Sequence, residues 1–205
     1  MGIYRDQLLP RVIDKALNNE GVERWRTQCV AGLTGVVVEP GFGSGLNVAL
    51  YPPEVTKVFA IDPAEVGEKL AADRLAKSEV TVDFVGLDGQ DLPLEYNSCD
   101  SALLTFTLCT IPDANTALAE LRRVVKPGGR LHFLEHGLSR DASIATWQKR
   151  IEPMQKLVFD GCHLTRPIPD LITDAGFEMD WVEQRYADGP KPWSWFSVGQ
   201  AINPA

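Results

Sequence analysis

The sequence predicts an α/β fold: a doubly wound, mostly parallel sheet of seven strands with an antiparallel hairpin at one edge. Between residues 35 and 134, short β-branched runs alternate with helical patterns, which indicates a parallel sheet with helices on both faces. The last two apolar runs are separated by the turn signal Asp188-Gly189-Pro190, and we expect no helix between them. Two strands joined in this way form an antiparallel hairpin.

Hydrophobic periodicity and the positions of Gly and Pro set the expected elements. Helical patterns precede the first strand at residues 5–18, where Pro10 is a candidate first-turn residue, and at 22–31. Strands are expected at 35–39, 57–62, 80–85, 101–105, 130–134, 179–184 and 195–201. Further helices are expected in a short piece from about Leu46 to the Pro52-Pro53 pair, and at 63–77, 113–125, 139–159 (kinked or divided at Pro153) and 167–175.

Size and charge limit the classes of protein. The 205 residues suit a single domain, 1–205, in which we expect residues 1–32 to form an N-terminal helical lid. The formal net charge of −8 argues against nucleic acid and against anionic lipid as partners. No stretch approaches the roughly 18 apolar residues of a membrane span, so we expect none.

The cysteines and histidines show no metal-binding spacing. Cys29, Cys99, Cys109 and Cys162 contain no Cys-x-x-Cys pair, so reduced thiols and a cytoplasmic location are expected. The ligand spacings of known zinc sites are missing, and we therefore expect no metal.

The most informative segment runs from Val36 to Gly45. Its apolar run ends at Glu39, and Gly41, Gly43 and Gly45 follow at alternate positions. Glycines allow a sharp turn and a close approach of ligand to backbone. A dinucleotide fingerprint would need its third glycine where Leu46 stands, which disfavours a nicotinamide cofactor. A helix beginning near Leu46 would turn its first amides toward an anionic ligand group.

Other polar residues follow the next strands, where ligands bind in open α/β sheets. Asp62 stands about 20 residues beyond the glycines, a position suited to ribose hydroxyls. The alternative is a helix N-cap ahead of Pro63. Asp88 and the Gly89 amide are placed to bind an adenine ring, or they form a surface turn.

Together these motifs resemble the class I S-adenosylmethionine-dependent methyltransferases, which have a Rossmann-like fold. The resemblance runs through EPGFGSG, AID, LDGQDLP, CDSALLTFTL and ALAELRRVVKPGGRLHFLEHG. It implies S-adenosyl-L-methionine as cofactor and direct in-line methyl transfer to an acceptor. The chain departs from the pattern at Pro40, which lacks an amide donor, and at Phe42, whose ring would narrow the loop. The implied cofactor-binding residues are Glu39, Gly41, Gly43, Gly45, Asp62, Pro63, Asp88, Gly89, Gln90 and Thr105.

A closer resemblance indicates the acceptor. The segments YPP (51–53), FLEH (133–136) and FDGCHLTR (159–166) are similar to those of mammalian methyltransferase-like proteins that methylate alkyl thiols. Those proteins carry an N-terminal membrane anchor that we do not recognise here, so small bacterial enzymes of the same branch are the nearer expectation. The resemblance implies a small, apolar acceptor, with a thiol as the leading candidate.

A thiol has a pKa near 8.5, so a modest base is sufficient to ionise it. The candidate catalytic residues are His136, Asp160 and His163, because His titrates in the required range. The alternatives are a backbone-bonded His136 and an Asp160 that ends a helix or pairs with Arg166. We interpret Cys162 as a packed residue. Aromatic side chains either line an apolar pocket or fill the core: Tyr4, Trp25, Trp147, Phe159, Trp193 and Trp195.

Three other functions stay open. The same cofactor site would serve O- or N-methylation of a phenol, quinone or lipid precursor. A non-catalytic binder of S-adenosylmethionine is a second alternative. A nicotinamide-dependent oxidoreductase is disfavoured because no Tyr is followed by Lys at the fourth position. The sequence leaves the acceptor and the oligomeric state undetermined.

Overall fold

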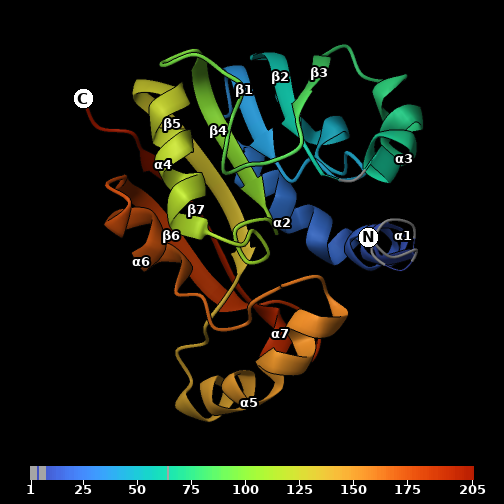
Figure 1. Ribbon diagram of the computed structural model, residues 1–205, viewed down its shortest axis with the longest axis vertical. Coiled ribbons are helices and arrows are strands. Elements are labelled where there is room, and N and C mark those ends of the chain that lie inside the picture. The colour runs from blue at the N-terminus through green and yellow to red at the C-terminus, as the bar shows by residue number, and fades with distance from the viewer. Residues whose placement is uncertain (1–3, 5–7, 64) are drawn as a thin grey trace.

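The computed structural model describes residue 4 and residues 8–63 and 65–205 (Figure 1). Within these residues, seven strands form one sheet in the order β3-β2-β1-β4-β5-β7-β6. β7 runs antiparallel to both β5 and β6, whereas the other neighbouring pairs are parallel. The predicted fold class and edge hairpin are therefore confirmed. The strands are β1 (Gly35–Pro40), β2 (Val55–Ile61), β3 (Thr81–Gly86), β4 (Cys99–Thr105), β5 (Val125–His136), β6 (Glu178–Tyr186) and β7 (Trp195–Ile202).

The helices begin where the sequence supplies caps. Asp113 accepts hydrogen bonds from the amides that open the fourth helix, and Asp141 does the same for the fifth. Asn19 caps the second helix through the Val22 amide. The elements are α1 (Leu9–Leu17), α2 (Glu20–Val30), the 3-10 turn η2 (Val48–Leu50), α3 (Glu65–Leu75), α4 (Ala114–Val124), α5 (Ala142–Val158), α6 (Ile168–Asp174) and α7 (Lys191–Ser194).

Two hydrophobic layers cover the sheet because neighbouring strand residues point to opposite faces. Val38 and Phe133 lie in the layer shared with α4 and α6. Val37 and Leu134 lie in the opposite layer, which contains residues of α2 and α3. The central strands β1 and β4 are mostly buried on both faces, as expected for a parallel sheet covered on both sides, whereas the edge strand β6 has no buried residue.

Two predicted connections are wrong. The helix expected near Leu46 is only the 3-10 turn η2, because the three loop glycines all have positive φ and carry the chain away from α geometry. The last two strands are not joined by a bare turn: the four-residue α7 lies between them, and its first turn contains a proline, Pro192, which favours a helix start. In addition, α5 continues through Pro153 as one helix.

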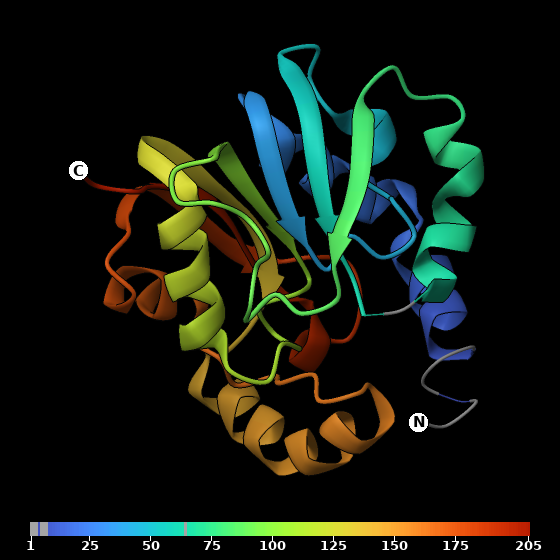
Figure 2. The same cartoon turned by 45° about the horizontal axis from the view of Figure 1, so that its top comes forward.

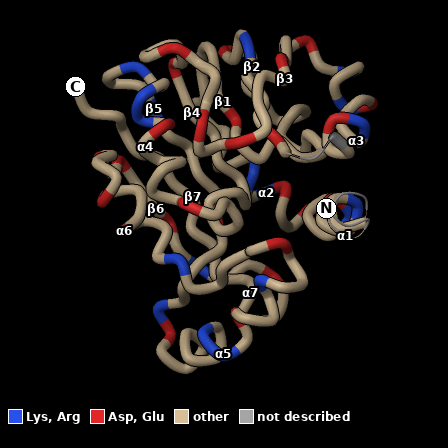
Figure 3. Tube along the Cα trace, in the orientation of Figure 1, with Lys and Arg blue, Asp and Glu red and all other residues tan. Residues whose placement is uncertain are grey.

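The carboxyl ends of β1, β2 and β3 meet on one side of the molecule (Figure 2). Helix α5 lies beyond these ends, and α1 lies to one side of them (Figures 1 and 2). Basic residues are spread over several elements, including α1, α3 and α5, with acidic residues interspersed (Figure 3). None of the helices in the described part of the chain is both long and apolar enough to cross a membrane.

Candidate functional site

The glycine loop after β1 requires glycine on geometric grounds. Gly41, Gly43 and Gly45 have φ values of +71°, +57° and +72°, in the left-handed region that favours glycine. A Cβ atom on Gly41 would lie 2.0 Å from the hydroxyl of Thr107 in the loop after β4. The loops after β1 and β4 are therefore in direct contact at Gly41, and a larger residue would separate them.

Asp62 joins the glycine loop to the end of β2. Its Oδ2 atom accepts a hydrogen bond of 2.7 Å from the Gly43 amide, and the residue is half-buried. Pro63 follows at an exposed bend before α3. The carboxylate thus stands at the carboxyl end of β2, where a ribose is bound in this fold class.

A buried polar network lies beneath the glycine loop. The Glu39 carboxylate accepts hydrogen bonds from the Asn47 amide (2.7 Å) and from the Tyr51 hydroxyl. Arg26 of α2 donates to Asn47 Oδ1 (2.8 Å) and to Thr105 Oγ1 (3.0 Å). Four of these side chains, Arg26, Glu39, Asn47 and Thr105, are buried. The network connects α2 to the carboxyl ends of β1 and β4.

Burial controls the electrostatics of this network. Burial raises the pKa of Glu39 to about 7, against the lowering effect of the Tyr51 and Asn47 hydrogen bonds and the Arg26 charge. Burial also lowers the pKa of Arg26. Among the described residues, Arg26 Nε has no hydrogen-bond partner although it is buried. An unsatisfied buried donor of this kind suits an anionic ligand group, such as an amino-acid carboxylate.

The loop after β3 is shaped by its own side chains. Asp88 Oδ1 accepts hydrogen bonds from the backbone and side-chain amides of Gln90. Gln90 Oε1 in turn accepts from the Asp113 amide at 2.8 Å, which ties the loop to the start of α4. A Cβ atom on Gly89 would lie 2.8 Å from Ile111, so the backbone is tightly packed there. The predicted adenine-binding residues therefore come together in one loop.

The loop after β4 is held from two sides. The buried Glu135 carboxylate accepts hydrogen bonds from the amides of Thr107, Leu108 and Cys109 at 2.7, 2.8 and 3.1 Å. Arg166 donates to carbonyl groups of the same loop, including that of Ile111 at 2.7 Å. Sequence reasoning missed Glu135, Arg26 and Asn47. Glu135 could have been found as an acidic residue inside an otherwise apolar strand, in the motif FLEH.

His136 lies at the end of β5 and faces two cysteines. Its Nε2 atom is 3.0 Å from Cys162 Sγ, which lies 3.9 Å from Cys109 Sγ. Burial acts to lower the pKa of His136, but the contacts with Cys162 and Glu135 raise it overall. The Cys109 contact and burial raise the pKa of the Cys162 thiol. Cys162 is packed, as expected from the sequence.

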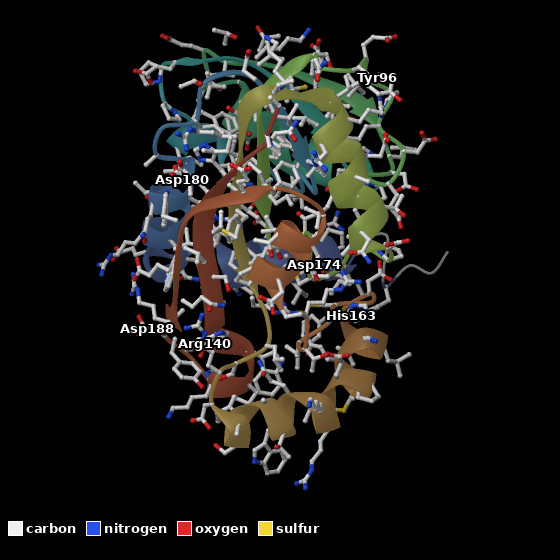
Figure 4. All side chains as sticks on the ribbon, turned by 90° about the vertical axis from the view of Figure 1, so that its left-hand side faces the viewer. Tyr96, Arg140, His163, Asp174, Asp180 and Asp188 are labelled. Atoms are coloured by element: carbon white, nitrogen blue, oxygen red, sulfur yellow. The ribbon has the colours of Figure 1, made fainter. Side chains whose placement is uncertain are left out.

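His163 lies on the segment between α5 and α6 (Figure 4). Its backbone amide donates to the Cys109 carbonyl at 2.7 Å, and its ring Nδ1 lies 3.3 Å from the same oxygen. Burial lowers the pKa of His163, although the side chain is partly accessible. Asp160 is exposed and stands just beyond α5 with φ of +46°. The structure thus brings both His136 and His163 close to Cys109.

The aromatic residues have different surroundings. Trp25 is buried in the core against Phe196, so the interpretation of Trp25 as pocket lining is wrong. Phe42 is also buried: its ring packs edge-on against Phe84 and lies 3.3 Å from the position that a Cβ atom on Gly45 would take. Tyr4, Trp147 and Trp193 are exposed, whereas Phe159 and Trp195 are half-buried.

Two residues near the N-terminus, Tyr4 and Asp14, contact the surroundings of the candidate site. Asp14 of α1 accepts a hydrogen bond from Ser44 Oγ in the glycine loop (2.6 Å) and pairs with Arg74 of α3 (3.0 Å). The Tyr4 hydroxyl donates to the Val158 carbonyl at the end of α5 (2.8 Å). Helix α1 therefore lies against the glycine loop, and Tyr4 lies against the end of α5.

The fold and these contacts define a class of protein. The glycine loop fits close backbone approach, Asp62 fits a ribose, and the unsatisfied Arg26 Nε atom fits the carboxylate of a methionine moiety. These features together suit S-adenosylmethionine, bound across the carboxyl ends of β1, β2 and β4.

Comparisons with known proteins identify the family. Residues 38–133 match the family model described as "Methyltransferase domain". The thiol S-methyltransferase TMT1B of Homo sapiens is 34% identical over 182 residues, covering 84% of this chain and 72% of the human protein. The ubiquinone/menaquinone biosynthesis C-methyltransferase UbiE of Syntrophotalea carbinolica is 29% identical over 139 residues, covering 63% of this chain and 58% of that protein. The chain belongs to the S-adenosylmethionine-dependent methyltransferases, and S-adenosylmethionine is its cofactor.

Solved structures agree on the fold. A SAM-dependent methyltransferase from Aquifex aeolicus superimposes with a TM-score of 0.65 at 20% sequence identity. The match covers 94% of this chain and 97% of that one, so the whole architecture is shared.

Proposed function

We propose that this enzyme transfers a methyl group from S-adenosylmethionine to a small, apolar thiol. The observation that carries the proposal is the meeting of the glycine loop and the His163 segment at one loop, residues 106–112, after β4. Cofactor and acceptor would thus be held against the same rigid piece of backbone. The similarity to the human thiol S-methyltransferase supports a thiol as the acceptor.

The protein would hold the cofactor through the groups described above. Arg26, with the network to Glu39, binds the amino-acid end, and Asp62 binds the ribose. Gly43, where an added Cβ atom would meet only the Gly41 carbonyl at 3.8 Å, would let the backbone lie close to the ligand. The loop after β3, with Asp88, frames the adenine. When bound, the cofactor supplies a sulfonium that already carries the activated methyl group.

We assign the base to His163. Its Nδ1 atom faces the Cys109 carbonyl at 3.3 Å, which favours the tautomer with a proton on Nδ1 and a free lone pair on Nε2. Burial lowers its pKa, so the ring is mostly neutral near pH 7 and accepts the thiol proton. The thiolate so formed would attack the methyl carbon in line, and the bond from that carbon to the cofactor's sulfur would break, giving a thioether and S-adenosylhomocysteine. His136 is less suitable because its Nε2 atom already faces Cys162.

The geometry contributes mainly by positioning. Holding a nucleophile in line with the methyl group is worth about 7–11 kcal/mol. The proposal includes a lid at residues 1–32, in which α1 contacts the glycine loop through Asp14 and Ser44, whereas α2 packs Trp25 and Cys29 into the core. A cytoplasmic location is proposed on the basis of the free cysteines.

The proposal is tested with matched panels of alkyl thiols and phenols, following S-adenosylhomocysteine formation. We expect turnover with thiols and little with phenols. The variant His163→Gln should lose about a hundredfold in kcat at neutral pH. The loss should shrink as pH rises toward the pKa of the thiol, because free thiolate then supplies the nucleophile.

The control variant is Asp160→Asn, which alters the exposed carboxyl three residues before His163. It should retain activity. If Asp160→Asn is inactive and His163→Gln is not, the base assignment is wrong. If phenols are methylated and thiols are not, the acceptor class is wrong.

A further inference from the structure

Three side chains with affinity for soft metals meet inside the protein, although they come from distant parts of the sequence. Cys109 lies in the loop after β4, His136 at the end of β5 and Cys162 between α5 and α6. We propose that Cys109, His136 and Cys162 form a binding site for a thiophilic divalent cation, with zinc as the cation to test. We refer to these three residues as the Cys2His cluster.

The distances are close to those of a zinc site. Tetrahedral zinc, with bonds of about 2.3 Å to sulfur and 2.0–2.1 Å to nitrogen, places two sulfurs about 3.8 Å apart and a sulfur and a nitrogen about 3.5 Å apart. The two sulfurs here are 3.9 Å apart, and His136 Nε2 is 3.0 Å from Cys162 Sγ. All three ligand atoms lie within 4.8 Å of one another. Small shifts of these three side chains would bring their ligand atoms to the distances of tetrahedral zinc.

The cluster is also shielded from water. Cys109 and Cys162 are 1% and 7% exposed, so water reaches them poorly. The second ring nitrogen of His136, Nδ1, is buried and finds no hydrogen-bond partner in the described part of the chain. Because Nδ1 points in another direction than Nε2, it takes no part in the cluster, and Nε2 is the ring atom placed to bind a metal beside Cys162.

The backbone around the cluster is already fixed. Glu135 and Arg166 hold the Cys109 loop from both sides, as described above. The Cys162 amide donates to the Phe159 carbonyl at 3.0 Å, and the His163 amide donates to the Cys109 carbonyl. Preorganised ligands of this kind lose little entropy when a metal binds.

The charge balance favours a dication. Binding releases one proton from each thiol to the buffer, and two thiolates then neutralise the two positive charges of zinc. Three protein ligands leave one tetrahedral position open, as in zinc sites that hold water or substrate. The sequence alone gave no indication of this site because no two of its ligands share a short spacing.

The experiment uses the full chain, reduced and stripped of metal with a chelator. Zinc is titrated in competition with a chromophoric chelator, and cobalt is added as a spectroscopic probe. We expect one equivalent of zinc per chain and a thiolate-to-cobalt charge-transfer band. Cys109→Ser and Cys162→Ser should each weaken zinc binding about a hundredfold or more. Cys99→Ser, a buried cysteine outside the cluster that contacts Ser98, should not.

A second measurement avoids dependence on the variants' folding. In the wild-type chain, zinc should protect Cys109 and Cys162 from alkylation under mild denaturant, as mapped by mass spectrometry, and leave Cys99 unprotected. Three results would overturn the proposal: no zinc uptake, uptake unchanged in both cluster variants, or equal protection of all cysteines. Formation of a Cys109–Cys162 disulfide without zinc uptake by the reduced chain would also overturn it.

Discussion

Replacement of Glu39 by Gln would measure how much the charge of this buried carboxylate, beneath the glycine loop, lowers the free energy of unfolding. The side chain is 1% exposed, and burial raises its pKa to about 7 from the ordinary value of 4.5. The difference of about 2.5 units, at about 1.4 kcal/mol per unit, corresponds to about 3 kcal/mol. Gln has nearly the same shape and keeps hydrogen-bonding capacity toward Asn47 and Tyr51.

The sign of the effect follows from proton binding. Below about pH 4.5, Glu39 is protonated in both the folded and the unfolded chain, and the carboxyl adds no pH dependence. Between about pH 4.5 and 7 the unfolded chain loses this proton first, so the wild type loses stability as pH rises. Above about pH 7 the loss is complete. The free energy of unfolding of Glu39→Gln should therefore exceed that of the wild type by about 3 kcal/mol at about pH 8.

The assay is denaturant unfolding of both proteins across this pH range, with Glu54→Gln as the control. Glu54 is an exposed acid, and its replacement should leave the pH dependence of unfolding unchanged. The reasoning is refuted if the difference between Glu39→Gln and the wild type is flat with pH, or if the wild type gains stability relative to the variant as pH rises.

Three further predictions concern packing and cofactor contacts. Gly41→Ala should abolish cofactor binding by calorimetry, because its Cβ would meet Thr107 at 2.0 Å. The control is Gly128→Ala, at a glycine with a similar φ of +79° but no neighbour within 4 Å of an added Cβ atom. It should lower the free energy of unfolding by only about 1–2 kcal/mol and leave cofactor binding intact. Arg26→Lys should weaken S-adenosylmethionine binding about tenfold, since Lys lacks the planar fork. Phe133→Ala, in the core, should lower the free energy of unfolding by about 3–5 kcal/mol.

Specific outcomes would contradict these predictions. Equal cofactor binding by Gly41→Ala and Gly128→Ala would mean that the contact between the β1 and β4 loops is not needed. Unchanged affinity in Arg26→Lys would remove Arg26 from the cofactor site. A small destabilisation by Phe133→Ala would mean that the core around β5 collapses to fill the space.

Local signals in the sequence were sufficient for most of the fold. The alternation of strands and helices predicted the mostly parallel sheet but not the order of its strands, and the caps at Asp113 and Asp141 stand at two helix starts. The connection after Gly45 was not predictable in the same way, because the glycine pattern does not reveal how the positive φ values at Gly41, Gly43 and Gly45 direct the chain. The short α7 was missed because the turn signal at Asp188-Gly189-Pro190 hid a four-residue helix after it.

The cofactor-binding residues stay a prediction, and that prediction rested on short motifs at the strand ends. Glycines and acids at strand ends indicated the cofactor loop and Asp62. Arg26 and Glu135 were missed because their roles depend on tertiary contacts: Arg26 reaches Thr105 from 79 residues away, and Glu135 reaches Thr107 from 28 away. For the same reason, sequence spacing did not reveal the Cys2His cluster.

The most direct test of the central claim is one turnover measurement. The purified enzyme is mixed with an alkyl thiol and S-adenosylmethionine carrying a deuterated methyl group, and the products are followed by mass spectrometry. We predict equal amounts of labelled methyl thioether and S-adenosylhomocysteine, both dependent on the enzyme. If the enzyme binds the cofactor but forms no labelled thioether from any thiol in the panel, the account of its function is contradicted.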